Sequence, residues 1–262
     1  MADAPRRLLC RVVAHDALTH DIWCVRLAPP AARRFSFHAG QYARLSFGPF
    51  PPRDYSMASQ PGSRELEFHI RQMNDDGASA YVARHLRVGE PVKLEGPFGE
   101  AYLREDHSGP ILAVAGGSGL APMGSIVETA LAADRDRRVH LYYGVREERD
   151  LYMEDRFRAL AQAHANFSFV PVLSNARAGG RRRQGTPDQA LSQDFRDLAG
   201  CKAYLAGPPA LVEAAVARLL GLGLSEDDIH ADPFYGDAEM AARRAGEKPP
   251  GGPGSLSPER ER

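Results

Sequence analysis

The stretch Ala-Gly-Gly-Ser-Gly-Leu-Ala-Pro, residues 115–122, decides the fold class of the second half of the chain. It follows the apolar run Ile111–Ala115, typical of a buried strand, and leads into residues 122–133, which are predicted as a helix. A glycine-rich turn there lets a main chain approach a pyrophosphate, whose charge the helix N-terminus favours. However, Pro122 replaces the third glycine of the usual G-x-G-x-x-G pattern, so a tight turn without a ligand is the alternative interpretation.

Strands and helices alternate after this turn. Short apolar runs predict strands at 139–145, 167–173, 203–206 and 229–231, and the segments 151–164 and 211–220 are predicted as helices. Such alternation is typical of a parallel sheet that helices cover on both faces. The change of composition between the two halves places a domain boundary near residues 104–109.

The residues before this boundary are predicted mainly as β-strands. One helix, residues 80–86, interrupts them, with Ser79 as its expected N-cap. Several short strands separated by turn residues indicate a small barrel or a sandwich. The expected strands lie at residues 8–13, 22–27, 41–47, 55–58, 66–72 and 91–94.

The last segment, residues 237–262, differs from both halves. It is rich in proline and glycine and poor in large apolar side chains. Such a segment cannot bury enough apolar surface to fold, so we expect a disordered tail.

Composition narrows the class of protein. The 33 basic and 34 acidic residues nearly balance, without the clustered basic face of a nucleic-acid binder. The apolar runs are too short to span a bilayer and the N-terminus lacks a signal-peptide core, so we expect a cytoplasmic monomer that binds neither nucleic acid nor membrane. The three cysteines are widely spaced, which predicts buried thiols rather than an iron–sulfur cluster, and we expect no metal site.

Two segments of the β half are candidate binding sites. In the run 53–56, Arg53 could pair with a phosphate, Tyr55 could stack on a flat ring, and the Ser56 hydroxyl can donate and accept. Taken alone, these residues are also compatible with an ordinary strand. A second glycine-bearing turn, residues 76–79, begins the predicted helix and is a second candidate anion site. Two anion sites in two halves indicate two nucleotides.

Four motifs in this order and spacing resemble the ferredoxin–NADP reductase superfamily. Within it, the chain is most similar to the reductase components of bacterial aromatic-ring oxygenases, over residues 6–236. The segments 143–146 and 230–235 fit the same pattern. The four motifs are Arg53-x-Tyr55-Ser56, Gly96-Pro97-Phe98-Gly99, the glycine-rich turn at 116–122, and Ala206-Gly207-Pro208-Pro209.

The resemblance implies a two-domain β plus α/β fold. A six-stranded antiparallel barrel, residues 1–106, would bind FAD, and a parallel-sheet domain, residues 107–236, would bind NAD(P)H. Arg53 would hold the FAD pyrophosphate. Tyr55 and Ser56 would be the catalytic residues, with Tyr55 packed on the isoalloxazine or ribityl chain and Ser56 hydrogen-bonded near flavin N5.

The resemblance assigns the remaining cofactor-binding residues by position. One segment would line the flavin through its main chain, a second would cap the pyrophosphate at a helix start, and two turns would enclose the nicotinamide dinucleotide. These groups are His69, Ile70 and Arg71; Gly77, Ala78 and Ser79; and Gly117, Ser118 and Gly119 facing Gly207, Pro208 and Pro209, with Arg146 and Phe234 as further cofactor-binding residues.

The implied function is hydride transfer from NADH or NADPH to bound FAD, followed by electron transfer to a separate redox protein. That acceptor would be a ferredoxin, a flavodoxin or an oxygenase component, because this chain has neither the length nor the cysteines of a fused iron–sulfur domain. An NAD(P)H:flavin reductase that releases its flavin is the alternative. A degenerate subunit that only scaffolds a partner is a third interpretation, which the intact 53–56 motif opposes.

Two features of the sequence leave alternative interpretations of the nicotinamide site. Many relatives have cysteine where this chain has Ala206, so a thiol contact with the nicotinamide is missing. The segment 175–185 carries Arg177, Arg181, Arg182 and Arg183, which fit a solvated loop, a clamp on the 2′-phosphate of NADPH, or a docking patch for an acidic ferredoxin. We favour NADH because the oxygenase reductases resembled here mostly prefer it.

Overall fold

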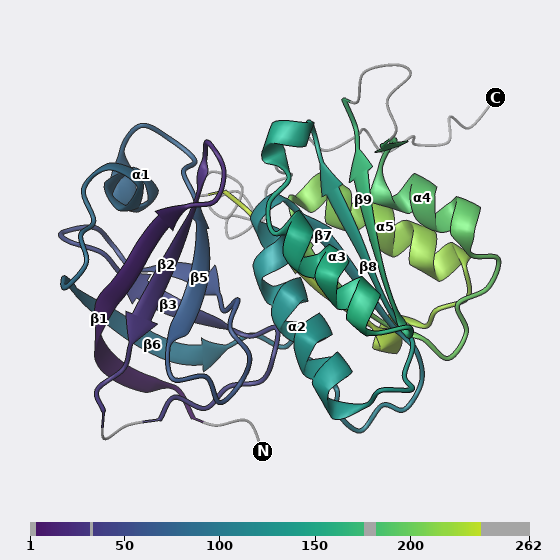
Figure 1. The fold of residues 1–262 in the computed structure, drawn as a ribbon, viewed down its shortest axis with the longest axis horizontal. Helices are drawn as coiled ribbons and strands as arrows, with labels where there is room; N and C mark the ends of the chain where they lie inside the picture. The colour runs from purple at the N-terminus through teal and green to yellow at the C-terminus, as the bar shows by residue number, and fades with distance from the viewer. Residues whose placement is uncertain (1–3, 32–33, 176–181, 237–262) are drawn as a thin grey trace, which may run out of the picture.

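The computed structural model describes residues 4–31, 34–175 and 182–236, which form two sheets side by side (Figure 1). Strands β1 to β6 make the first sheet and β7 to β12 the second. The predicted boundary at residue 106 falls in the connection between them. The predicted tail, residues 237–262, lies outside the described residues.

The first sheet is a nearly closed, six-stranded antiparallel barrel, which confirms the implied fold. Its strand order is β4-β3-β6-β1-β2-β5, so β4 and β5 are its edges. A bridge between Met57, just after β4, and Phe68 of β5 brings the two edges together. The strands are β1 (Arg6–Ala17), β2 (Ile22–Ala28), β3 (Tyr42–Ser46), β4 (Arg53–Ser56), β5 (Leu66–Arg71) and β6 (Pro91–Phe98).

Alternating side chains fill the barrel. Leu8, Cys10 and Val12 of β1 point inward, as the two-residue period of a strand requires, and belong to one buried apolar cluster. Helix α1 (Gly77–Arg84) covers this cluster with Val82. All three cysteines are buried free thiols, as their spacing predicted.

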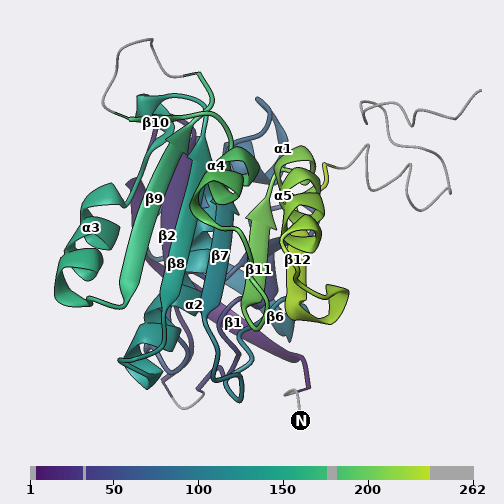
Figure 2. The same cartoon turned by 90° about the vertical axis from the view of Figure 1, so that its right-hand side faces the viewer.

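The second sheet is fully parallel, with the order β10-β9-β8-β7-β11-β12 (Figure 2). Its strands are β7 (Ile111–Gly116), β8 (Val139–Val145), β9 (Phe167–Leu173), β10 (Arg183–Gln184), β11 (Lys202–Gly207) and β12 (Ile229–Pro233). The helices are α2 (Leu120–Ala133), α3 (Glu154–Ala163), α4 (Pro187–Asp194) and α5 (Pro209–Gly221).

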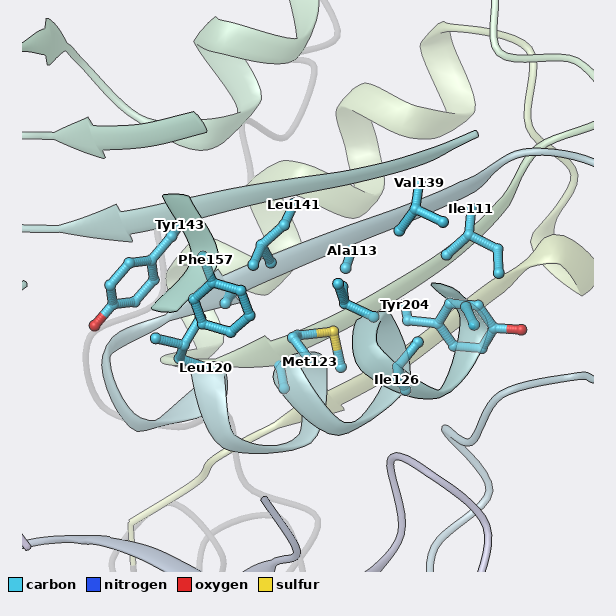
Figure 3. Close-up of a cluster of buried hydrophobic side chains, with 14 of the residues drawn as sticks. Ile111, Ala113, Leu120, Met123, Ile126, Val139, Leu141, Tyr143, Phe157 and Tyr204 are labelled. Atoms are coloured by element: carbon cyan, nitrogen blue, oxygen red, sulfur yellow. The ribbon is translucent and has the colours of Figure 1, made fainter. Parts of the chain in front are cut away.

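Helices cover both faces of the parallel sheet. On one face, Leu120 and Met123 of α2 and Phe157 of α3 pack against side chains of β7, β8 and β11 (Figure 3). On the other face, α4 and α5 pack against a second cluster that includes Leu112 and Tyr142. The strands β7, β8 and β11 are therefore buried on both sides, which explains their continuous apolar sequences. No helix within the described ranges is both long and apolar enough to cross a membrane.

Two predicted helix starts are wrong by three residues, and the predicted starts of α2 and α5 are each two residues late. Helix α1 begins at Gly77 with Asp76 at the N-cap, so Ser79 lies inside the helix. Helix α3 begins at Glu154 rather than at residue 151, because Met153 has a left-handed φ of 54° that a helix cannot continue through.

The prediction also missed β10 and α4. The two-residue β10 is too short to leave an apolar pattern. Helix α4 does carry a start signal, because Pro187 follows Thr186, which forms a capping box with Gln189.

Candidate active site between the two sheets

The glycine-rich turn lies at the carboxyl end of β7, where one turn of 3-10 helix (Gly117–Gly119) leads into α2. Strand β11 runs beside β7, with Ala206 in register with Ala115. A side chain on Gly119 would overlap the carbonyl group of Ala206, and one on Gly207 would lie 2.6 Å from the carbonyl oxygen of Gly116. The two predicted turns therefore meet main chain to main chain, with Pro208 and Pro209 following at the start of α5.

Gly117 differs from these two glycines. Its φ is +52°, and its missing side chain would lie 3.4 Å from a guanidinium nitrogen of Arg71, which comes from the barrel. Arg71 is oriented by Asp21, whose Oδ2 accepts from Arg71 Nε at 2.8 Å. Burial opposes ionisation of Asp21, but hydrogen bonds from Thr19 and Arg71 outweigh it and lower the pKa of Asp21. The structure thus brings a cation of the barrel to the glycine turn of the other sheet.

Arg71 was expected to line the flavin through its main chain, together with His69 and Ile70. Ile70 is fully buried in the barrel cluster. The His69 side chain is also buried, and its ring forms hydrogen bonds with Tyr152 of the parallel-sheet half and with Glu67. Sequence reasoning missed Asp21 and Tyr152, since neither residue belongs to a motif.

Strand β4 carries the first candidate motif on an edge of the barrel. It pairs with β3, with Ser56 opposite Tyr42 and Tyr55 opposite Ala43. Tyr55 is half-buried and its ring meets that of Phe47 edge to face, with centroids 5.9 Å apart. Arg53 is exposed and Ser56 is half-buried.

The first turn of α1 carries the second candidate motif. Gly77 has φ +82° and open space where its side chain would be, and the Asp76 side chain makes no capping bond. Ala78 is buried, and the Ser79 hydroxyl accepts from the Met73 N–H at 3.3 Å. The start of this helix therefore leaves room for a ligand next to its main chain.

Comparison with known proteins agrees with this two-domain architecture. Residues 9–102 match the family model of the oxidoreductase FAD-binding domain, and residues 113–217 match that of the oxidoreductase NAD-binding domain. The chain is 44% identical, over 86% of its length and 68% of the relative's, to the ferredoxin–NAD(P)(+) reductase component of the naphthalene 1,2-dioxygenase/salicylate 5-hydroxylase systems of Ralstonia. The chain belongs to the ferredoxin–NAD(P) reductase family.

Other comparisons support this membership. The reductase component of the naphthalene 1,2-dioxygenase system of Pseudomonas putida is 43% identical over 86% of the chain and 68% of its own length. The crystal structure of an Amycolatopsis cytochrome P450 reductase superposes with a TM-score of 0.81 at 35% identity, covering 88% of this chain and 70% of that one. The chain is therefore a flavin-dependent oxidoreductase that uses FAD and NAD(P)H.

Two residues at and just after the end of β12 in the reductase, Asp232 and Phe234, lie beside Ala206 and Gly207. The Phe234 N–H donates to the Gly207 carbonyl oxygen at 2.8 Å, and Asp232 is in register with Ala206. Burial, with a smaller contribution from Asp54, raises the pKa of Asp232 to about 6. Ala206 itself is fully buried, so its side chain is part of the packed sheet.

The described arginines of the reductase's 175–185 segment are already paired. Arg182 forms ion pairs with Glu148 and Glu154, and Arg183 pairs with Asp194 at 2.5 Å. Arg177 and Arg181 lie outside the described residues. Arg146, at the end of β8, is exposed and lies 3.5 Å from Asp150.

The contact between the two turns makes a strong prediction for Gly119→Ala. The added methyl group would overlap main-chain atoms of Ala206, which cannot rotate away. We expect the free energy of unfolding to fall by about 1–3 kcal/mol, the usual cost of overpacking. Urea unfolding of both proteins measures this loss. Gly221→Ala is a matched control for the methyl group, because no atom lies within 4 Å of that position and its φ is not left-handed. Equal stability of Gly119→Ala and wild type would contradict the contact.

Proposed function

We propose that this reductase passes electrons from NADH through bound FAD to a separate redox protein, a ferredoxin or an oxygenase component. Its two relatives from Ralstonia and Pseudomonas putida are reductase components of dioxygenase systems, and this chain spans 68% of each. The observation that carries the proposal is the approach of the Arg71 guanidinium of the barrel to Gly117 in the turn after β7, which supports a shared site between the two domains.

The cofactor-binding residues that we propose lie in both domains. FAD, when bound, accepts a hydride from the nicotinamide and delivers electrons singly, which a ferredoxin requires. The edge strand β4 supplies Arg53 for the pyrophosphate, Tyr55 for the ring system and Ser56 near N5. The open helix start at Gly77, Ala78 and Ser79 binds the same pyrophosphate, and the main chain of His69, Ile70 and Arg71 lines the flavin.

The facing turns bind the nicotinamide nucleotide. Gly117, Ser118 and Gly119 lie at the start of α2, where main-chain N–H groups and the helix dipole favour a pyrophosphate. Gly207, Pro208 and Pro209 form the opposite wall, with Phe234 bonded to Gly207 beside them. The Arg71 guanidinium adds a positive charge at Gly117. We assign residues 1–106 to the FAD-binding domain and 107–236 to the NAD(P)H-binding domain.

NADH is the proposed donor because of charges after β8. The end of the strand that follows the glycine-rich unit is where such folds contact the adenosine ribose, and an acidic residue there suits a free 2′-hydroxyl. Here Glu147, Glu148 and Asp150 supply three carboxylates within four residues. The described arginines nearby are paired with carboxylates, as Arg182 is with Glu148. Arg146 and Arg149 in the same segment pair with Asp150 and Glu147, so the carboxylates favour NADH as acceptors for the ribose hydroxyl and not through a net negative charge.

Anaerobic stopped-flow reduction tests donor and function together. We expect NADH to bleach the bound flavin with a kcat/KM at least about tenfold above that of NADPH, which corresponds to about 1.4 kcal/mol of discrimination. Reduced protein should then be reoxidised by an added [2Fe-2S] ferredoxin. Flavin that stays with the protein through gel filtration distinguishes this function from a reductase that releases flavin. Failure of both nucleotides to bleach the flavin would contradict the proposal.

The cytoplasm is the proposed compartment. Cys10, Cys24 and Cys201 are all unpaired, and proteins in reducing compartments keep their thiols in this state.

A further inference from the structure

The two faces of β5 point to different parts of the molecule. Leu66, Phe68 and Ile70 are fully buried in the barrel cluster. The alternate residues Glu67, His69 and Arg71 lie on the other face of the strand. Figure 1 shows β5 on the side of the barrel next to the parallel-sheet domain, and the strand contacts the 3-10 turn at Gly117–Gly119. The face of β5 that carries these three residues is therefore turned toward the other domain.

His69 links the two domains. Its Nδ1 lies 3.1 Å from the Tyr152 hydroxyl, and its Nε2 lies 3.0 Å from Glu67 Oε1. The hydrogen bond from His69 lowers the pKa of Glu67, so this carboxylate is ionised near neutral pH and only accepts. Nε2 therefore donates to Glu67, and Nδ1, when the ring is neutral, accepts a hydrogen bond from the Tyr152 hydroxyl. The result is an oriented chain of hydrogen bonds, Tyr152 to His69 to Glu67.

Tyr152 is held firmly at its end of the chain. It is 4% exposed and packs in the cluster of the parallel-sheet domain, with the Tyr143 ring edge-on at 5.9 Å. Burial raises the pKa of Tyr152 well above its usual range, so the hydroxyl keeps its proton and remains a donor. A rigid donor on one domain thus meets a buried acceptor on the strand of the other.

We propose that the chain Tyr152–His69–Glu67 positions the flavin-lining strand β5 against the nicotinamide-binding domain. Tyr152 is a positioning residue, because it acts through His69. This inference rests on the proposed function, in which the main chain of β5 lines the flavin. Hydride transfer requires the reacting atoms to approach within about 3–3.5 Å, and small displacements of either ring slow it strongly. The bond between Tyr152 and His69 ties β5 to the nucleotide domain, so it acts on this distance through the strand that lines the flavin.

A metal site formed by Glu67 and His69 with Cys24 is the alternative interpretation. Ligand atoms of Cys24, Glu67 and His69 lie within 4.8 Å of one another. However, both nitrogens of His69 already have protein partners. Burial raises the pKa of the Cys24 thiol to about 12, and a metal needs the thiolate. The geometry therefore supports hydrogen bonding by His69 rather than metal binding.

Tyr152→Phe in the full-length holoprotein tests the proposal. It removes one hydroxyl and keeps the ring. We expect the single-turnover rate of flavin reduction at saturating NADH to fall about three- to tenfold, the loss corresponding to one hydrogen bond. The charge-transfer absorption of stacked nicotinamide and flavin should weaken, while FAD stays bound.

Glu67→Gln tests the hydrogen-bonded chain from the barrel side. The double variant should reduce its flavin no more slowly than the slower of the two single variants, because both substitutions disrupt the same hydrogen-bonded chain.

Tyr142→Phe is the matched control. Tyr142 is also buried, and its hydroxyl bonds to Asp194 at 2.6 Å within the nucleotide domain, on the other face of the sheet. This variant should lower thermal stability without changing the reduction rate or the charge-transfer band. Wild-type rate and band in Tyr152→Phe would overturn the proposal. Wild-type protein that neither NADH nor NADPH bleaches would instead overturn the proposed function.

Discussion

Replacing Ser56 by alanine is expected to leave FAD bound but to slow its reduction tens to hundreds-fold. This loss of rate corresponds to roughly 2–4 kcal/mol of lost transition-state stabilisation. Ser56 lies on β4, opposite Tyr42 of β3, and its hydroxyl can donate or accept. N5 of flavin is an acceptor before reduction and carries a hydrogen afterwards, so such a hydroxyl suits both states. The pyrophosphate contacts proposed for Arg53 and the start of α1 are untouched by the change.

Single-turnover bleaching under anaerobic conditions, with saturating NADH and then NADPH, measures this effect. Ser46→Ala is a suitable control, because Ser46 is a half-buried serine at the opposite end of β3 from Tyr42. Its bleaching rate should match that of wild type. If Ser56→Ala also bleaches at the wild-type rate with both nucleotides, Ser56 is a strand residue only and its proposed role is wrong.

Replacing Arg53 by alanine is expected to weaken FAD binding at least about tenfold. Charge-assisted hydrogen bonds to a phosphate contribute about 1.5–3 kcal/mol each, and 1.4 kcal/mol corresponds to one decade in Kd. Arg53→Lys should recover part of this loss, because it keeps the charge without the two-pronged geometry. Titration of the apoprotein with FAD, followed by fluorescence quenching, gives the three dissociation constants.

Arg7→Ala is the matched control for Arg53→Ala. Arg7 is also exposed on the barrel, but it lies on β1 and pairs with Glu95 at 3.0 Å. The FAD affinity of this variant should equal that of wild type. A folded Arg53→Ala protein with unchanged FAD affinity would remove Arg53 from the pyrophosphate site.

The sequence predicts most of the fold because burial leaves a regular pattern. The bounds expected for two central strands, 139–145 and 167–173, are those of β8 and β9. Both strands are mainly apolar, since helices cover both faces of the sheet. Helix starts are harder to predict, since Asp76 and Ser79 are both plausible caps and only the conformation of the turn decides between them.

The candidate site could be predicted only where it consists of local motifs. Arg53, Gly117 and Gly207 stand in recognisable segments. The pair that connects the two domains does not, because His69 and Tyr152 are 83 residues apart. No pattern of spacing links such residues, since their proximity depends on how the two sheets pack.

The contact between the two glycine turns has a consequence for second-site suppression. The atoms that a side chain at Gly119 or Gly207 would strike belong to the main chain, which no other substitution can remove. A side chain at Gly185 would instead meet the flexible end of Gln189. Damage at Gly185 can therefore be relieved in part by a smaller residue at position 189, whereas damage at Gly119 or Gly207 has no such local suppressor. In a library selected for revertants, these two positions should recover only by returning to glycine.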